Sequence, residues 1–233
     1  MDMTRRNSRE SGLSLIELIV AMGLSLAVLA GAYNLFKSQT RVHLLHNQVM
    51  GLQDSARFAF DSIVRDLQMA GYDAQESKVF GITAYKDSDF AFNDESTLSL
   101  AVTNQIYFTN DSDGDSEIDN NSSERFGYRL NSGNLESASI STADGSISSW
   151  DILMDNVETL SFVYTYSNGT LSSTVGLPNN AAANRHFRDI RSVTVSLRVK
   201  ASQRDPGYTD PDFGDNYRRT TLTGKVFPRN LSF

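Results

Sequence analysis

The sequence predicts an α+β protein in which one long N-terminal helix packs on one face of an antiparallel β-sheet. An apolar run of 24 residues, Leu13 to Phe36, is followed by apolar residues at helical spacing as far as Ala70. Segments of strand-like residues then fill the chain from about residue 97 onward, with no helical pattern between them. Strands that follow one another without helices form antiparallel sheets, and such a sheet needs a helix to cover one face.

The apolar run is long enough to cross a membrane. At about 1.5 Å per residue, a helix of this length exceeds the ~30 Å hydrocarbon core. Glu17 is the only charged residue in the run, and the leader before it, residues 1–12, carries three arginines against two acids. Because positive charge favours the cytoplasmic side, we expect Met1 in the cytoplasm and the chain after Phe36 outside the inner membrane.

Beyond Phe36 the helix is predicted to continue as an amphipathic segment. Lys37 and Arg41 mark the membrane interface, and apolar residues then recur at spacings of three and four. This apolar face consists of Val42, Leu45, Val49, Leu52, Ala56, Ala59, Ile63, Leu67 and Ala70. No proline occurs before Pro178, so the helix should run from about Ser14 to Gly71, which is a typical terminator. A free coiled coil has similar spacing, but the strands that follow need a helix as cover.

The rest of the chain, residues 73–233, is predicted to be β-rich. Strand signals fall on residues 79–84, 97–103, 105–109, 125–130, 135–140, 157–166, 192–200 and 218–227. Asn131–Asn134 should form a turn, and two polar loops, 167–185 and 205–216, separate the last strands. The chain therefore divides into a leader at 1–12, a membrane helix at 13–36, an amphipathic helix at 37–72 and the β-rich domain at 73–233.

The composition describes an acidic body without disulfides. The net charge is −7, and removing the leader, which carries +1, leaves −8. This balance argues against nucleic acid as a partner. There is no cysteine, so a domain outside the cytoplasm, where disulfides are common, must hold its tail by packing alone.

The junction Gly12-Leu13-Ser14-Leu15-Ile16-Glu17, between a basic leader and an apolar helix, resembles the class III signal of type IV pilins and of type II secretion pseudopilins. The resemblance implies a type IV pilin-like fold, cleavage by prepilin peptidase between Gly12 and Leu13, and N-methylation of Leu13. The usual first residue of that family is Phe, and Leu13 departs from it. For Glu17 the resemblance implies a role in assembly, pairing with the N-terminal amine of a neighbouring subunit.

Three other interpretations of the apolar run are weaker. A secretory signal would be cut after its core, and Ala30-Gly31-Ala32 has suitable small residues, but that core is usually only about 7–15 residues long. An ordinary membrane anchor fits the hydropathy equally well, yet it leaves Glu17 unexplained, since a carboxylate at a helix centre costs on the order of 2.5–3.5 kcal/mol on insertion. A buried core helix would be shorter.

A narrower resemblance lies in the amphipathic half of the helix. Leu52–Asp61 and Arg65–Tyr72 resemble segments of the PilW family of minor pilins, and Thr221–Leu231 resembles its terminal strand. The resemblance implies a minor pilin that helps to initiate a pilus, at its tip, with other minor pilins, the major pilin, prepilin peptidase and the inner-membrane assembly platform as partners. A J-type pseudopilin of type II secretion and a membrane-tethered, calcium-dependent adhesive module remain as alternatives. As helix-face residues, Phe58, Phe60, Met69 and Tyr72 are expected in the core.

One acidic stretch has the spacing of metal ligands. Asp111, Asp113 and Asp115 occupy positions one, three and five of an EF-hand-type calcium loop, Glu117 offers a backbone ligand at seven, and Asp119 is the acid at nine. Position six is Ser116 rather than Gly, and position twelve is Ser122, so the bidentate acid is missing unless Glu124 replaces it. A solvated acidic turn explains the stretch equally well, and Ca²⁺ is the one cofactor that the sequence suggests.

Catalysis finds little support in the sequence. His43 and His46 form a pair at helical spacing beside the membrane, where solvated side chains are the simpler explanation. There is no cysteine nucleophile, no HExxH and no GxSxG motif. The acids of the loop at 205–216, which are Asp205, Asp210, Asp212 and Asp215, are explained by turn chemistry. The sequence therefore predicts a non-enzymatic protein.

Overall fold

The computed structural model describes residues 14–73, 75, 80–83, 104–117, 124–139, 149–173 and 190–231. By its contacts the chain separates into two units, Met1–Asn47 and Gln48–Phe233, each of which is described by itself. The leader, Leu13, Asp119 and the predicted strand at 97–103 lie outside the described residues.

The N-terminal helix, α1, spans Leu15–Met69, in agreement with the predicted Ser14–Gly71. In the first unit its side chains are exposed throughout residues 14–47, except for the partly covered Leu45. By length and composition the helix is able to cross a membrane. Val42, which was predicted to begin the packed stripe, is 49% exposed, so the packed face begins later, in the second unit.

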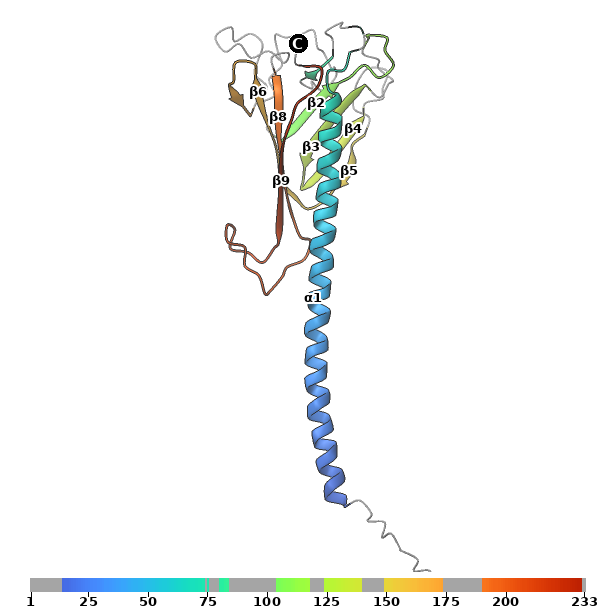
Figure 1. Ribbon diagram of the computed structural model, residues 1–233, viewed down its shortest axis with the longest axis vertical. Helices are drawn as coiled ribbons and strands as arrows, with labels where there is room; N and C mark the ends of the chain where they lie inside the picture. Colours follow the sequence, from blue (N-terminus) through green and yellow to red (C-terminus); the bar gives the residue numbers. More distant parts are fainter. Residues whose placement is uncertain are drawn as a thin grey trace, which may run out of the picture. The chain divides into compact units, whose positions relative to one another are not determined.

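In the described residues of the second unit, nine strands form two antiparallel sheets (Figure 1). The five-stranded sheet has the order β1-β2-β3-β4-β5, formed by Ile82–Thr83, Gln105–Thr109, Arg125–Asn131, Asn134–Ser139 and Asp151–Met154. The four-stranded sheet has the order β7-β6-β8-β9, formed by Leu171–Ser172, Val157–Tyr166, Ile190–Lys200 and Arg219–Val226. The sequence predicted one sheet, and the structure has two. The α+β class and the antiparallel pairing of the strands are confirmed.

The division into two sheets occurs at a corner of two residues between β5 and β6. Asn156 there has a φ of 57°, a left-handed conformation that Asn tolerates better than most residues. The corner directs β6 away from β5, so that β5 pairs with β4 and β6 pairs with β8 and β7. Residues on β2, β3 and β4 nevertheless contact β6, and both sheets contribute side chains to one hydrophobic core.

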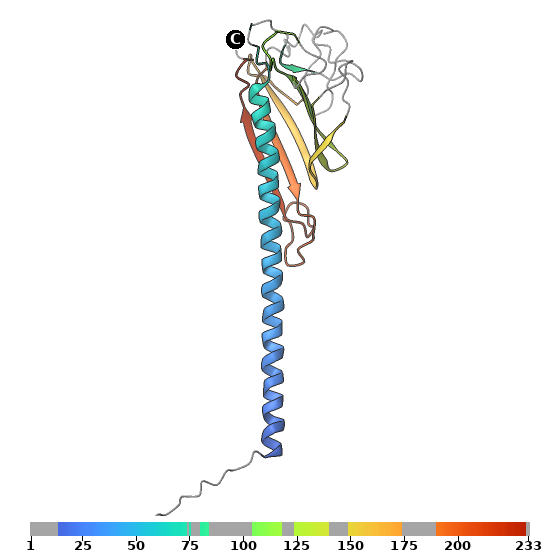
Figure 2. The same cartoon turned by 90° about the vertical axis from the view of Figure 1, so that its right-hand side faces the viewer.

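The C-terminal part of α1 covers this core (Figures 1 and 2). The helix side chains with no exposed surface are Ala56, Ala59, Ile63 and Leu67, and Ala70 just after the helix is equally buried. The sheets meet them with apolar residues such as Phe108, Phe162 and Val195, and Phe108 stacks on Phe126 with 5.4 Å between ring centroids. Glycine allows a close approach at one point, because a Cβ on Gly224 of β9 would lie 2.9 Å from the ring of Phe60.

Three of the four aromatic or sulfur-containing residues expected in the core are exposed instead. Phe58, Met69 and Tyr72 keep 68%, 42% and 40% of their surface, whereas Phe60 is partly buried against the core as expected. Phe58 and Met69 are eleven residues apart, about three helical turns, so they share a face. That face is turned away from the buried alanines, which are the residues that contact the sheets.

Candidate functional sites

The predicted processing signal lies at the start of the described chain. Gly12 and Leu13 precede the described residues, and α1 begins two residues later, with the amide of Leu18 donating to the carbonyl of Ser14 at 3.1 Å. Glu17 lies in the first helical turn with its side chain exposed. A carboxylate at this position interacts favourably with the positive end of the helix dipole. Glu17 therefore lies on an exposed surface of the first turn of α1.

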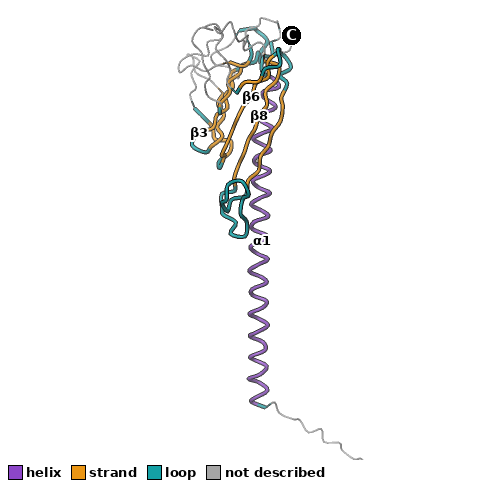
Figure 3. Tube along the Cα trace, turned by 90° about the vertical axis from the view of Figure 1, so that its left-hand side faces the viewer, coloured by secondary structure: helices purple, strands orange, loops and turns teal. Residues whose placement is uncertain are grey.

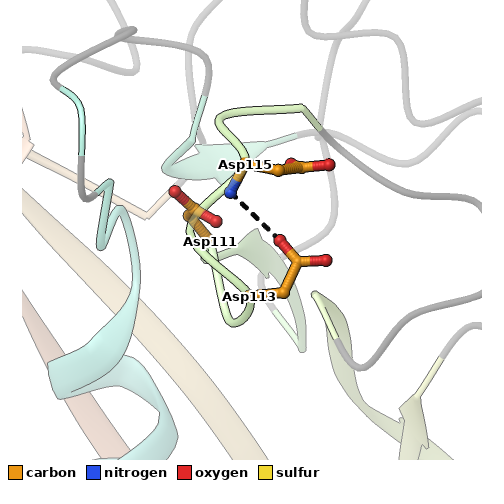
Figure 4. A group of neighbouring side chains, drawn as sticks. All are labelled: Asp111, Asp113 and Asp115. Atoms are coloured by element: carbon orange, nitrogen blue, oxygen red, sulfur yellow. Dashed lines mark hydrogen bonds between the residues drawn. The ribbon is translucent and has the colours of Figure 1, made fainter.

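The acidic loop after β2 brings three predicted ligands together (Figure 4). One carboxylate oxygen each from Asp111, Asp113 and Asp115 lie within 4.8 Å of one another. Asp111 is fully buried, and the other two are exposed. Among the described residues this is the only group of three or more acids or histidines close enough to hold a metal ion. His43 and His46 are exposed and belong to no such group.

Backbone amides hold each of the three carboxylates in place. Asp111 Oδ1 accepts from the amide of Gly114 at 2.7 Å, and Asp113 Oδ1 accepts from the amide of Asp115 at 3.2 Å. Asp115 Oδ1 accepts from the amide of Glu117 at 2.8 Å. Each of the three residues offers one carboxylate oxygen to a hard cation. Ser116 has a φ of 69°, so the substitution of Ser for the usual Gly at position six places a non-glycine residue in a strained conformation.

The end of α1 fixes the loop in space. The amide of Gly71 donates to Thr109 at 2.8 Å, the amide of Asp111 donates to Tyr72 at 2.7 Å, and Gln75 Nε2 donates to the carbonyl of Gly114 at 3.0 Å. Any ion in the loop would therefore act directly on the junction between the helix and β2.

Glu124 reaches the loop from the start of β3. Its side chain is fully buried, and its Oε1 accepts from the amide of Ser112 at 3.0 Å. The sequence suggested Glu124 as a substitute for the missing acid at position twelve, and the structure brings it to the same loop. A buried carboxylate must be paired, hydrogen-bonded or metal-bound, and Glu124 meets this requirement through the amide of Ser112.

The long connection between β8 and β9 is drawn as a loop in Figure 3. A second charged cluster, which we call the arginine clasp, holds this connection. Arg219 donates to Glu158 at 2.8 and 2.9 Å, to Asp215 at 2.7 Å through two nitrogens, and to Asp210 at 3.1 Å. Its side chain is 8% exposed. Hydrogen bonds from Arg219 lower the pKa of Asp215 to about 2, and the same carboxylates raise the pKa of Arg219.

Sequence reasoning explained the acids of this connection by turn chemistry, which is only part of their role. Asp210 does accept from the amides of Asp212 and Phe213, at 3.0 and 3.2 Å. It is nevertheless buried against Arg219, and Asp205 is likewise buried and paired with Arg218 at 2.9 Å. The ring of Phe213 lies 4.1 Å from the guanidinium carbon of Arg219. The consecutive Arg218-Arg219 after four acids was the signal that could have revealed the clasp.

Two family models match the chain. The prokaryotic N-terminal methylation motif matches residues 7–33, and the model of prepilin peptidase-dependent protein B matches residues 46–217, which is most of the chain. The chain belongs to the prepilin peptidase-dependent protein B family. It is thus a type IV pilin-like protein that depends on prepilin peptidase, and its apolar N-terminal helix is of the kind that anchors pilins in a membrane.

Comparison with known proteins adds little beyond these families. Among solved structures, the chain is similar to a type IV-like pilin from Thermus thermophilus, with 14% identity and a TM-score of 0.47 over 78% of this chain and 98% of that one. No curated protein sequence matches the chain.

Proposed function

We propose that the protein is a minor pilin of the PilW type, a structural subunit that helps to initiate a type IV pilus at its tip. The observation that carries the proposal is the joint match of the methylation motif and of the prepilin peptidase-dependent family, on a chain whose first helical half is apolar and exposed. Exposed apolar helices need a bilayer or other helices around them, and a pilin has each in turn. No catalytic step is part of this function.

In this proposal the chain is first a single-pass protein of the inner membrane. The leader lies in the cytoplasm and the domain after residue 47 in the periplasm, as the arginines of the leader favour. Prepilin peptidase cuts between Gly12 and Leu13, and the assembly platform then moves the subunit into a filament with other minor pilins and the major pilin. The residues of the PilW-like segment support the fold of such a subunit, since Ala56, Ala59 and Leu67 form the buried face of α1.

A J-type pseudopilin of type II secretion has the same signal and architecture. Filament fractionation separates the two proposals, because a pilus subunit sediments with sheared surface filaments and copurifies with other minor pilins. Recovery with components of a secretion pseudopilus, and absence from sheared pili, would favour the pseudopilin.

Processing provides the first test. Mass spectrometry of the mature protein should find an N-terminal peptide that starts at methylated Leu13. Gly12→Ala should be largely tolerated because the residue stays small, whereas Gly12→Phe should leave the leader attached. An intact Met1 in the wild-type protein, or a start at Tyr33 after Ala32, would show that the chain is not processed as a prepilin.

A second function, calcium binding, is favoured by the convergence of Asp111, Asp113 and Asp115 within 4.8 Å and by the arrival of Glu124 at the same loop. The carboxylates would provide hard oxygen ligands, with the carbonyl of Glu117 and the side chain of Asp119 as further candidates. Bound Ca²⁺ would fix the loop against the end of α1. In an adhesive module this loop would be the calcium-dependent part of the binding surface.

A further inference from the structure

The part of α1 that follows the apolar run carries positive charge with no acid close to it in the sequence. Residues 18–53 contain no Asp and no Glu. Lys37 and Arg41 lie in this stretch, and both side chains are exposed. Within the described part of the first unit the one acid is Glu17, twenty residues before Lys37 and so about 30 Å away along the helix. This distance exceeds the Debye length of about 8 Å at physiological salt, so Glu17 does not neutralise the pair.

The two cations also lie close to each other. Lys37 and Arg41 are four residues apart on α1 and therefore share one face of the helix. Like charges at this spacing destabilise a helix, and no acid lies nearby in the sequence to offset the repulsion between the two cations. The hydroxyl of Thr40, next to Arg41, donates to the carbonyl of Phe36 at 2.9 Å. An anion between the two side chains would convert a repulsive pair into a binding site.

The position of the pair identifies the source of that anion. Tyr33 and Phe36 are 66% and 68% exposed at the end of the apolar run, and aromatic side chains of this kind favour the membrane–water interface. Lys37 follows immediately, and Arg41 lies about 6 Å further along the helix. A bilayer of about 40–45 Å with a 30 Å core has a headgroup layer about 5–8 Å thick on each side. Both cations therefore fall at the depth of lipid phosphates.

We infer that Lys37 and Arg41 bind the phosphates of anionic phospholipids in the leaflet where the apolar run ends. The guanidinium of Arg41 donates two parallel hydrogen bonds to phosphate oxygens, and the ammonium of Lys37 contributes a compact charge. The inference rests on the membrane orientation in the proposed function. Cleavage after Gly12 would remove the three leader arginines. The cations left to bind acidic lipid would then be Lys37 and Arg41, at the periplasmic end of the apolar run. When the subunit is extracted into a filament, Lys37 and Arg41 must release the bound lipid.

Lipid retention by the full-length, processed protein tests the inference. The protein is placed in nanodiscs of one-third phosphatidylglycerol and two-thirds phosphatidylcholine, and native mass spectrometry counts the lipids that stay bound after release. The wild type should retain phosphatidylglycerol well above its share of the bilayer. Each cation near an anionic surface contributes about fivefold in affinity, so Lys37→Gln with Arg41→Gln should lower the preference by on the order of 25-fold.

A matched variant removes the same charge from elsewhere on the helix. Arg57→Gln with Arg65→Gln alters two exposed arginines of the second unit and should leave lipid retention unchanged. An equal loss in both variants, or no preference in the wild type, overturns the inference, as does displacement of the lipid by millimolar inorganic phosphate. The N-terminal mass of the same preparation reports processing separately, so a failure here is distinguishable from a failure of the proposed pilin function.

Discussion

A carboxylate in the first turn of an apolar helix meets two environments during the life of a pilin-like subunit. In a lone α1, Glu17 is exposed in the first helical turn. It lies beside the N-terminus that the proposed cleavage after Gly12 would create, close enough to the interface to stay hydrated. When apolar helices pack into a filament core, that hydration ends. A buried charge without a partner costs several kcal/mol, so the carboxylate must be paired. The amine of Leu13 in a neighbouring subunit is the partner that the pilin resemblance implies, and pairing would set the axial register of each entering helix.

We therefore predict that Glu17→Ala leaves membrane insertion, cleavage and the folded second unit intact, while incorporation into filaments falls. Glu17→Gln should behave similarly, since it keeps the shape and removes the charge. Immunoblots of sheared filaments against the membrane fraction measure the effect. Wild-type amounts of Glu17→Ala protein in filaments, together with normal piliation, would contradict this role.

Calcium binding by the acidic loop is testable through one residue, Asp113. If Asp113 is a calcium ligand, a soluble fragment beginning at Val42 should gain stability in calcium relative to chelator. For a Kd of about 0.1–1 mM, a few millimolar Ca²⁺ should add on the order of 1–2 kcal/mol to the free energy of unfolding. Asp113→Ala should abolish the gain, and Asp151→Ala, an exposed acid on β5, should retain it. Identical melting curves with calcium and chelator would leave the loop a plain acidic turn.

At the scale of elements, the strands with the clearest alternation were predicted most closely. β2 and β6 have the predicted bounds, and β8 begins two residues earlier than predicted. The short β5, four residues long, was missed because it offers too little alternation to be recognised. Partition into two sheets was not predictable either, since it depends on a left-handed residue at a two-residue corner and on long-range pairing rather than on local pattern.

The same limit explains the misplaced helix residues. Spacing defined the buried face of α1 correctly from Leu52 onward, but Phe58 was assigned to the core by its apolar character and not by its angle. Of the candidate sites, the acidic loop was visible in the sequence because its ligands are consecutive. In the clasp, Arg218-Arg219 after four acids is a visible signal, but the pairing with Glu158 is not, because Glu158 is sixty-one residues from Arg219. Contacts of that kind are set by the fold.

The approach of α1 to β9 through Gly224 gives a prediction at this scale. Gly224→Val would drive its side chain into the ring of Phe60, which lies 2.9 Å from the position of the added Cβ. Overpacking of this kind costs about 1–3 kcal/mol, measured by denaturant unfolding. Phe60→Ala in the same chain should recover part of the loss, and Thr221→Val, an exposed position of β9, should be nearly neutral. Additive effects of Gly224→Val and Phe60→Ala would show that the two side chains do not meet.

At the scale of the whole molecule, the absence of cysteine leaves long connections to be held by other means. The connection from Ala201 to Arg218 is longer than two neighbouring antiparallel strands need. The arginine clasp closes it with ion pairs from β6, from β9 and from the connection itself. Arg219→Gln should therefore lower Tm by several degrees in calorimetry, because Glu158 and Asp210 lose their shared cation. Lys225→Gln, an exposed cation of the same strand, serves as the control.

The clasp also predicts how acid acts on the second unit. Hydrogen bonds from Arg219 lower the pKa of Asp215 to about 2, below the value of about 3.9 that Asp has in an unfolded chain. The unfolded state therefore binds more protons between these two values. The contribution of Asp215 to stability is complete above about pH 4 and is lost as the pH falls toward 2. In Arg219→Gln the largest cause of the lowered pKa of Asp215 is removed, so the difference in unfolding free energy between wild type and variant should shrink across this window. A difference that stays constant from pH 5 to pH 2 would mean that Arg219 stabilises the connection by packing on Phe213, and not through the charge of Asp215.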